Sequence, residues 1–386
     1  MSTLIKAALI AVMTLYCNAP DSHAAETAKV KIPARFAYVG GYTTPKREGK
    51  AKGLEVFAID ADGKWTGIQT IPMENPSYLA MDNNKLRLYA CQGDGTQVTA
   101  FAIDPEAGTL SLINVGQTSG VNGVHIAVSP DDKQLAVANY SGGTVDVFAL
   151  NTDGSIGPRT GSLDTGGETG VLKSQKGSYP HQVVFSSDGR YLLVPDKGRD
   201  LVHTIVLNGT GGAISLKSSM YSRPGVGSRH MDFHPTLPFA YVIEESDNSI
   251  TVCEWNANTG VLTPVQWVPL VPDTYFFSHR GTNEEGGAAI WVDPKGDHVY
   301  GTQRGLNVIG AFAIDKANGF LKPIGWQSSQ GLRPRFFTFD PSGEYVFLAN
   351  QMSDNIIAYK RDGNTGRLDS VGTIMETGSP VCILFR

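Results

Sequence analysis

One pattern recurs six times along this sequence, with copies that begin at Pro76, Asn122, Tyr179, Gly227, Gly286 and Arg333. Each copy holds a short strand of alternating apolar residues, a turn such as Ser-Ser-Asp-Gly or Asp-Pro-Ser-Gly, and a second strand. A third apolar alternation follows, and in most copies a fourth. The copies start about 46 to 59 residues apart. Four antiparallel strands in a repeat of this length are typical of a β-propeller blade.

The two ends of the chain complete the count. Residues 35–43 match a second strand that has no first strand before it, and residues 378–385 match a first strand that has no second strand after it. The sequence therefore predicts an all-β, seven-bladed β-propeller whose first blade is closed by the C-terminal strand, which leaves no open sheet edge. Unrelated β-sandwiches would not share one register or leave complementary half-blades. Although 386 residues alone suggest two or three domains, we expect one domain over residues 25–386.

The first 24 residues have the pattern of a secretory signal peptide. Lys6 precedes an apolar run over residues 7–16, and Ser22-His23-Ala24 offers a small-residue cleavage site after Ala24. The run is shorter than the roughly 20 residues that a membrane-spanning helix needs. We therefore expect a periplasmic or secreted protein, if the source is bacterial, with no membrane attachment after cleavage.

Composition excludes several classes of function. The net charge of -5 leaves no basic surplus for nucleic acid. Cys91, Cys253 and Cys382 lie in apolar, strand-like contexts, so we expect buried inert thiols rather than a disulfide framework. No Cys/His zinc spacing, nucleophile elbow, phosphate-binding loop or dinucleotide fingerprint occurs in an appropriate context. The sequence predicts neither a metal nor a cofactor.

Aligning the copies isolates charged residues at two fixed offsets. The first offset, early in the first strand, holds His181, Arg229 and Arg335, and the second, just after the second strand, holds Lys197, Glu245 and Arg304. Because the first strand of a blade lines the central channel, we expect these six side chains to converge near one mouth of that channel. Several cations around one carboxylate suit an anionic substrate. The alternative is that these charges only pair with one another.

Neighbouring positions have structural explanations. His125 and His230 are one step out of register, so we expect them to point away from the channel as satisfied structural histidines, and His234 lies in a turn. Oxygen-bearing side chains beside the second offset suit turn capping better than a cation site; they are Asn139, Asp196, Glu244 and Asn350. The long connections over residues 164–177 and 271–285 could shape the mouth; in the second, Tyr275, Phe276, Phe277 and His279 could form a lid or simply pack on the rim.

The whole mature chain resembles the seven-bladed propeller lactonase family, which includes bacterial 6-phosphogluconolactonases and fungal carboxymuconate-cyclising enzymes. The stretches that carry the resemblance are YVGGYT at Tyr38, PHQVVFSSDGRYLLVPDKGRD at Pro180, GSRHMDFHPTLPFAYVIEE at Gly227, GLRPRFFTFDPSGEYVFLANQMSDNI at Gly331 and the terminal SPVCILF.

The resemblance implies that His181, Arg229, Glu245 and Arg304 are catalytic. Two departures bear on these assignments. Family members often read NEL where this chain has Ile-Glu-Glu, so Glu244 competes with Glu245, and they often read SNR where this chain has TQR.

Three functions are consistent with these observations. The first is hydrolysis of a small anionic sugar lactone. There Arg229 and Arg304 would hold the anionic group and the oxyanion, His181 or Glu245 would activate water, and Arg335 and Lys197 would supply outer positive charge. The second is a lactonising cycloisomerase, which differs from a hydrolase in product mass. The third is a non-enzymatic propeller that binds a ligand or a protein. Because a closed ring has no free edge, we expect a monomer.

Overall fold

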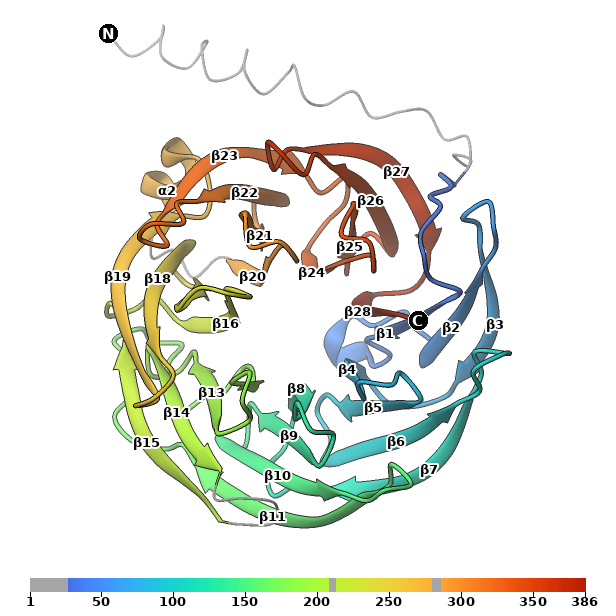
Figure 1. Ribbon diagram of the computed structural model, residues 1–386, viewed down its shortest axis with the longest axis horizontal. Helices are drawn as coiled ribbons and strands as arrows, with labels where there is room; N and C mark the ends of the chain where they lie inside the picture. Colours follow the sequence, from blue (N-terminus) through green and yellow to red (C-terminus); the bar gives the residue numbers. More distant parts are fainter. Residues whose placement is uncertain (1–26, 208–212, 280–285) are drawn as a thin grey trace, which may run out of the picture.

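The computed structural model describes residues 27–207, 213–279 and 286–386. Seven four-stranded antiparallel sheets stand around a central channel, and the first strand of each repeat lies innermost (Figure 1). The predicted seven-bladed β-propeller is therefore confirmed. The predicted signal peptide and its cleavage site after Ala24 lie outside the described residues. Within the described residues no helix has the length and apolar character to cross a bilayer.

The blades share one strand order, from the channel outwards. Blade 1 consists of β28 (Pro380–Phe385), β1 (Phe36–Gly41), β2 (Leu54–Ile59) and β3 (Trp65–Ile71). Blade 2 consists of β4 (Pro76–Met81), β5 (Arg87–Gln92), β6 (Gln97–Ile103) and β7 (Leu110–Gln117). Blade 3 consists of β8 (Gly123–Val128), β9 (Gln134–Asn139), β10 (Thr144–Leu150) and β11 (Ile156–Asp164). Blade 4 consists of β12 (Val184–Phe185), β13 (Tyr191–Asp196), β14 (Leu201–Leu207) and β15 (Ile214–Tyr221).

The remaining three blades repeat this order. Blade 5 consists of β16 (Ser228–Phe233), β17 (Phe239–Glu244), β18 (Ser249–Asn256) and β19 (Val261–Pro269). Blade 6 consists of β20 (Gly287–Val292), β21 (His298–Gln303), β22 (Val308–Ile314) and β23 (Leu321–Ser328). Blade 7 consists of β24 (Pro334–Phe339), β25 (Tyr345–Asn350), β26 (Asn355–Arg361) and β27 (Leu368–Glu376). Within the described residues two short helices lie between strands, η1 (Pro45–Arg47) and α2 (Asp273–His279).

The C-terminal strand closes the ring as predicted. Strand β28 pairs with β1 in antiparallel register, with Tyr38 opposite Leu384 and Gly40 opposite Cys382. Its side chains Val381, Cys382 and Ile383 are at most 2% exposed. The two ends of the chain are thus joined by backbone hydrogen bonds and by buried apolar area, both of which stabilise the closed form.

Neighbouring blades are tied by a recurring tyrosine. The hydroxyl of a second-strand tyrosine donates to a turn carbonyl of the next blade: Tyr38 to Gly108, Tyr89 to Gly154, Tyr241 to Gly319 and Tyr300 to Gly366. The turn glycine Gly319 has a φ of 73°, and a Cβ at this position would lie 2.5 Å from the Phe239 ring. Glycine is required there both by the left-handed backbone and by this close approach.

Candidate active site

The predicted site residues meet at one end of the channel, where the first strands begin and the second strands end. A cavity of about 320 Å³ opens there, and five of the six predicted side chains line it: His181, Lys197, Glu245, Arg304 and Arg335. They come from blades 4 to 7, so the grouping predicted from the repeat register is observed for these five. A larger hollow of about 1020 Å³ lies between blades 4 and 5, but none of the predicted residues lines it.

Two of the three residues at the first offset, Arg229 and Arg335, sit on β-bulges. In β16, Ser228 pairs with Glu244 and His230 pairs with Ile243, so Arg229 is the extra residue. In β24, Pro334 pairs with Asn350 and Phe336 with Ala349, so Arg335 is extra in the same way. A bulge re-aims a side chain where the ladder is interrupted. The irregularity therefore recurs at the position that presents the charged residues.

Glu245 is surrounded by three cations. Its Oε1 lies 2.6 Å from Lys197 Nζ and 3.0 Å from an Arg304 guanidinium nitrogen, and its Oε2 lies 2.9 Å from Arg229 Nε. Burial opposes ionisation of Glu245, but Arg304, Lys197 and Arg229 together hold its pKa well below the usual range. Glu245 is therefore an ionised carboxylate that orients cations.

Arg229 lies beneath the cavity rather than on its wall. It is 2% exposed, and its guanidinium donates to the Ala288 carbonyl and forms an ion pair with Glu245. Its position differs from the predicted contact with a substrate anion. The contact with Ala288 of β20 shows that blade 6 lies against the side chain, and its ion pair with Glu245 connects it to the cavity wall.

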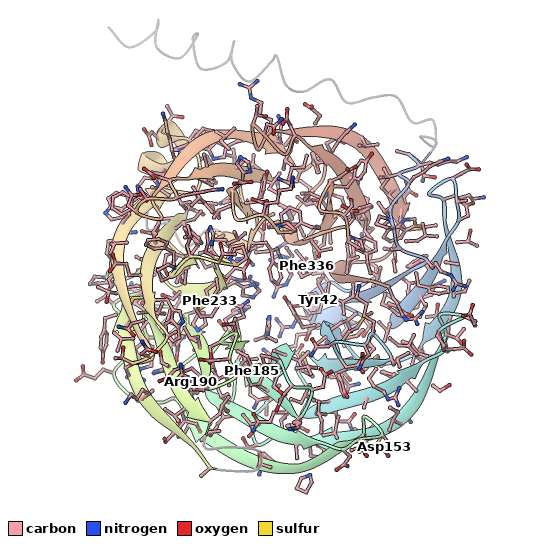
Figure 2. The ribbon with its side chains drawn as sticks, viewed as in Figure 1. Tyr42, Asp153, Phe185, Arg190, Phe233 and Phe336 are labelled. Carbon is pink, nitrogen blue, oxygen red and sulfur yellow. The ribbon has the colours of Figure 1, made fainter. Side chains whose placement is uncertain are left out.

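Arg335 is the cavity cation without a carboxylate partner among the described residues. Its guanidinium lies 5.3 Å from the centroid of the Tyr42 ring, and burial lowers its pKa. Tyr42 lies beside the channel in Figure 2. The other outer arginines are engaged: Arg47 binds Asp94 at 2.7 Å and Arg333 lies 3.4 Å from Glu48. Removing part of a cation from water is costly unless a counter-charge is present, and an anionic ligand in the cavity would supply the one that the described residues do not.

His181 is held among rings. Its imidazole packs edge-on against Tyr140 at 5.3 Å between centroids, and Tyr140 stacks on Tyr179 at 4.7 Å. Burial and the nearby Arg229 lower the pKa of His181 well below its usual value, so the ring is neutral at pH 7. A neutral imidazole on the cavity wall can accept a proton.

The prediction that His125 and His230 point away from the channel is wrong. The His230 ring lies 5.3 Å from that of His181 and 5.6 Å from that of His125, and the Nε2 atoms of His125 and His230 are buried without a partner among the described residues. Directly paired residues share a face of the sheet. Ser228 pairs with Glu244, whereas His230 pairs with Ile243, the residue next to Glu244 in β17. Ser228 and His230 therefore lie on opposite faces, although residues two apart in a regular strand share a face. The prediction assumed a regular strand, and the bulge at Arg229 breaks that alternation.

The turn-capping predictions are confirmed. Asp196 accepts from the Ser178 hydroxyl and the backbone N–H groups of Tyr179 and Gly198, and Glu244 accepts from Ser222 at 3.0 Å. The amide of Asn139 donates to the Thr144 hydroxyl at the start of β10, and that of Asn350 donates to the Ser329 carbonyl; His234 Nδ1 accepts from the turn N–H of Leu237 at 2.9 Å. Glu244 points away from the cavity, so Glu245 is its carboxylate.

The remaining sequence predictions concern thiols, metals and the mouth. Cys91, Cys253 and Cys382 are buried and unbridged, as predicted. Nowhere in the described ranges do three or more His, Cys, Asp or Glu side chains form a metal-holding group. The connection after residue 271 begins with helix α2, in which Phe276 is 1% exposed and stacks on Trp267 at 6.2 Å. Phe276 therefore packs on the rim; the side chains of Phe277 and His279 lie outside the described part.

Among the cavity-lining residues that sequence reasoning did not assign to the site, three have charged or aromatic side chains. Arg47 comes from η1 in the long connection between β1 and β2, Arg333 precedes β24 with a φ of 63°, and Tyr140 follows β9. Arg47 and Arg333 stand outside the two repeat offsets. The basic character of residues 46–52 and the Arg-Pro-Arg of residues 333–335 were the available signals.

Comparisons with known proteins agree with this architecture. The family model described as "Lactonase, 7-bladed beta-propeller" matches residues 36–385. A 6-phosphogluconolactonase of Bacillus subtilis is 31% identical over 355 residues, which cover 91% of this chain and 98% of that protein. A solved structure of a periplasmic gluconolactonase of Pseudomonas aeruginosa superposes with a TM-score of 0.81 at 29% identity and covers 91% of this chain and 98% of that one. A putative 6-phosphogluconolactonase of Bacteroides fragilis has a TM-score of 0.80 at 27% identity, with 95% and 100% covered.

Proposed function

Because this chain belongs to the seven-bladed β-propeller lactonase family, and is by that membership a lactone-hydrolysing enzyme, we propose that its cavity hydrolyses a small anionic sugar lactone. The observation that carries the anionic part of the proposal is Arg335, whose partly buried guanidinium lines the cavity with no carboxylate partner among the described residues. A phosphate or carboxylate on the sugar would supply the missing charge.

The reaction follows from the placement of the charges. His181 accepts a proton from a water molecule as the water oxygen attacks the lactone carbonyl carbon. Lys197 and Arg304, which line the cavity, stabilise the negative charge that develops on the carbonyl oxygen. The bond between the carbonyl carbon and the ring oxygen then breaks, and the proton held by His181 passes to the leaving oxygen. The product is the open-chain sugar acid.

Glu245 is assigned a positioning role. Its two oxygens already bind Lys197, Arg304 and Arg229, so they are not free to accept a proton from a water molecule. By holding the charged groups of these three side chains in place, Glu245 determines the electrostatic environment of His181. A cycloisomerase would use the same proton-accepting group without consuming water, so product mass separates the two: hydrolysis adds one water molecule.

The Arg335→Gln variant tests the anionic substrate. We expect kcat/KM for 6-phosphogluconolactone to fall by about 10- to 100-fold, because one charge-assisted hydrogen bond contributes about 1.5–3 kcal/mol. For uncharged gluconolactone the fall should be less than about threefold. Both rates are measured by pH-stat titration of the released acid, after subtraction of spontaneous hydrolysis. An equal fall for both substrates would contradict the proposed anion contact.

Activity should persist into mild acid. Since burial and Arg229 lower the pKa of His181, the basic imidazole is retained as the pH falls through 6.5, the usual value for histidine. We expect kcat/KM to stay level between about pH 7.5 and 5.5, where an ordinary histidine base would lose about 90% of its activity. Direct detection of the sugar acid by mass spectrometry gives the profile. A decline centred near pH 6.5 would contradict a buried neutral base.

We also infer export from the cytoplasm. The support is the N-terminal apolar run with a small-residue site at Ala24 and the similarity to the periplasmic gluconolactonase. Mass spectrometry of the protein recovered from the periplasm of an expressing bacterium should give a chain that begins at Ala25. Recovery of an uncleaved chain from the cytoplasm would contradict this inference.

A further inference from the structure

A second cavity opens at the opposite mouth of the channel, where the first strands end and the second strands begin. Its volume is about 510 Å³, and its walls include Phe185, Met231, Trp291 and Phe336. Figure 2 shows Phe185 and Phe336 on opposite sides of the channel. This volume lies in the range of small-molecule sites, which are largely apolar with a few placed polar groups.

The cavity is separate from the candidate active site. Between the two mouths the rings of Tyr78, His125, His230 and His181 follow one another, with centroids 3.9, 5.6 and 5.3 Å apart. Among the described residues no Lys or Arg lines the second cavity, whereas Lys197, Arg304 and Arg335 line the first. An anionic sugar lactone therefore finds no counter-charge in the described walls at this end.

Two donors at the second cavity lack acceptors. The backbone N–H of Val183 points at His125 Nδ1 at 3.5 Å, so Nδ1 is the acceptor and Nε2 carries the proton of a neutral ring. His125 is 5% exposed, and its Nε2 is buried without a partner among the described residues; the same holds for Trp291 Nε1. A buried donor without an acceptor costs about 1–3 kcal/mol. Two such donors beside one cavity favour a ligand that brings an acceptor.

A carboxyl group on the wall of this cavity limits the charge of the ligand. Asp232 accepts the backbone N–H of Val292 at 2.8 Å and that of Phe233 at 2.9 Å. Burial raises its pKa to about 7. The carboxyl thus alternates between neutral and negative near physiological pH, and a second negative charge beside it would be repelled.

We propose that this cavity is a binding site for a small uncharged molecule that has a flat apolar body and a carbonyl oxygen. The apolar body would lie against Phe185, Met231 and Phe336. The carbonyl oxygen would accept from Trp291 Nε1. The proposal does not depend on the lactone substrate, since the two cavities share no lining residue within the described ranges.

The test uses 6-propionyl-2-dimethylaminonaphthalene, an uncharged aromatic ketone whose emission reports polarity and hydrogen bonding. Added to the mature protein at pH 6.5, it should show a saturable blue shift with one site per chain. Trp291→Phe should weaken its binding about five- to tenfold, because one hydrogen bond is lost while the ring contact remains. Trp326→Phe is the matched control: Trp326 Nε1 donates to the Leu270 carbonyl outside this cavity, so affinity should stay unchanged.

Two variants that fill the cavity keep the test decisive even if one of them fails to fold. Ala127 and Thr338 line the cavity from β8 and β24. Ala127→Trp should abolish the saturable signal, and the smaller change Thr338→Leu should weaken binding severalfold. The proposal is overturned if the probe shows no saturable signal with the folded wild-type protein. It is also overturned if the folded filling variants, or Trp291→Phe, bind the probe as the wild type does.

Discussion

Replacing His181 with alanine is expected to lower kcat/KM for lactone hydrolysis by about 10²- to 10⁴-fold, the usual contribution of a general base. The ring lies on the cavity wall between Tyr140 and His230, and its lowered pKa leaves it unprotonated at pH 7, as a proton acceptor must be. The rate is measured by pH-stat titration with 6-phosphogluconolactone, after subtraction of the uncatalysed reaction.

Chemical rescue separates a base from a packing residue. Alanine at position 181 leaves a space at the cavity wall, so added imidazole should restore part of kcat in proportion to its concentration. His181→Phe retains the ring contact with Tyr140 but cannot accept a proton, and it should be neither active nor rescued. If the folded His181→Ala protein hydrolyses the lactone at the wild-type rate, His181 is not the base.

Replacing Glu245 with glutamine is expected to lower the free energy of unfolding by about 3–5 kcal/mol, the cost of leaving buried charges uncompensated. Arg229, Arg304 and Lys197 all lose their counter-charge. The catalytic rate of this variant should also fall, because these three cations no longer have fixed positions. Urea denaturation followed by tryptophan fluorescence gives the free energy.

The effect has a pH signature with a defined sign. The folded-state pKa of Glu245 is held below its unfolded value, so its stabilising contribution is present above about pH 4.5 and is lost as the pH falls through the folded-state pKa. The difference between wild type and Glu245→Gln should therefore be full at neutral pH and shrink in acid. A difference that is the same at every pH would contradict an ionised Glu245.

Two controls accompany the Glu245 variant. Glu344→Gln changes an exposed carboxylate on a turn and should alter the free energy of unfolding by less than about 0.5 kcal/mol. Adding Lys197→Met to Glu245→Gln removes one of the uncompensated cations and should recover part of the loss. No recovery would indicate that Lys197 and Glu245 do not interact energetically.

A large part of the fold could be predicted from the sequence, because a propeller is built from one unit. Each blade repeats the same alternation of apolar residues and the same turn, so the pattern can be identified independently in six copies. The half-blades at residues 35–43 and 378–385 predict how the ring is closed. Equivalent offsets in a ring of equivalent blades reach equivalent places around the axis. For this reason the repeat register was sufficient to predict that one mouth of the channel holds His181, Lys197, Glu245, Arg304 and Arg335.

The tertiary structure determined the side-chain positions that neither the alternation of apolar residues nor the blade repeat could predict. The bulges in the innermost strands insert one residue, which brings His125 and His230 into the channel beside His181 and lets blade 6 cover Arg229. Arg47 and Arg333 reach the cavity from connections outside the two repeat offsets. The two-residue alternation of a strand determines the face on which a side chain lies only while the backbone pairing between neighbouring strands is regular. Where the backbone gains a residue or leaves the sheet, side-chain direction depends on the packing of neighbouring blades, and that packing exists only in the folded ring.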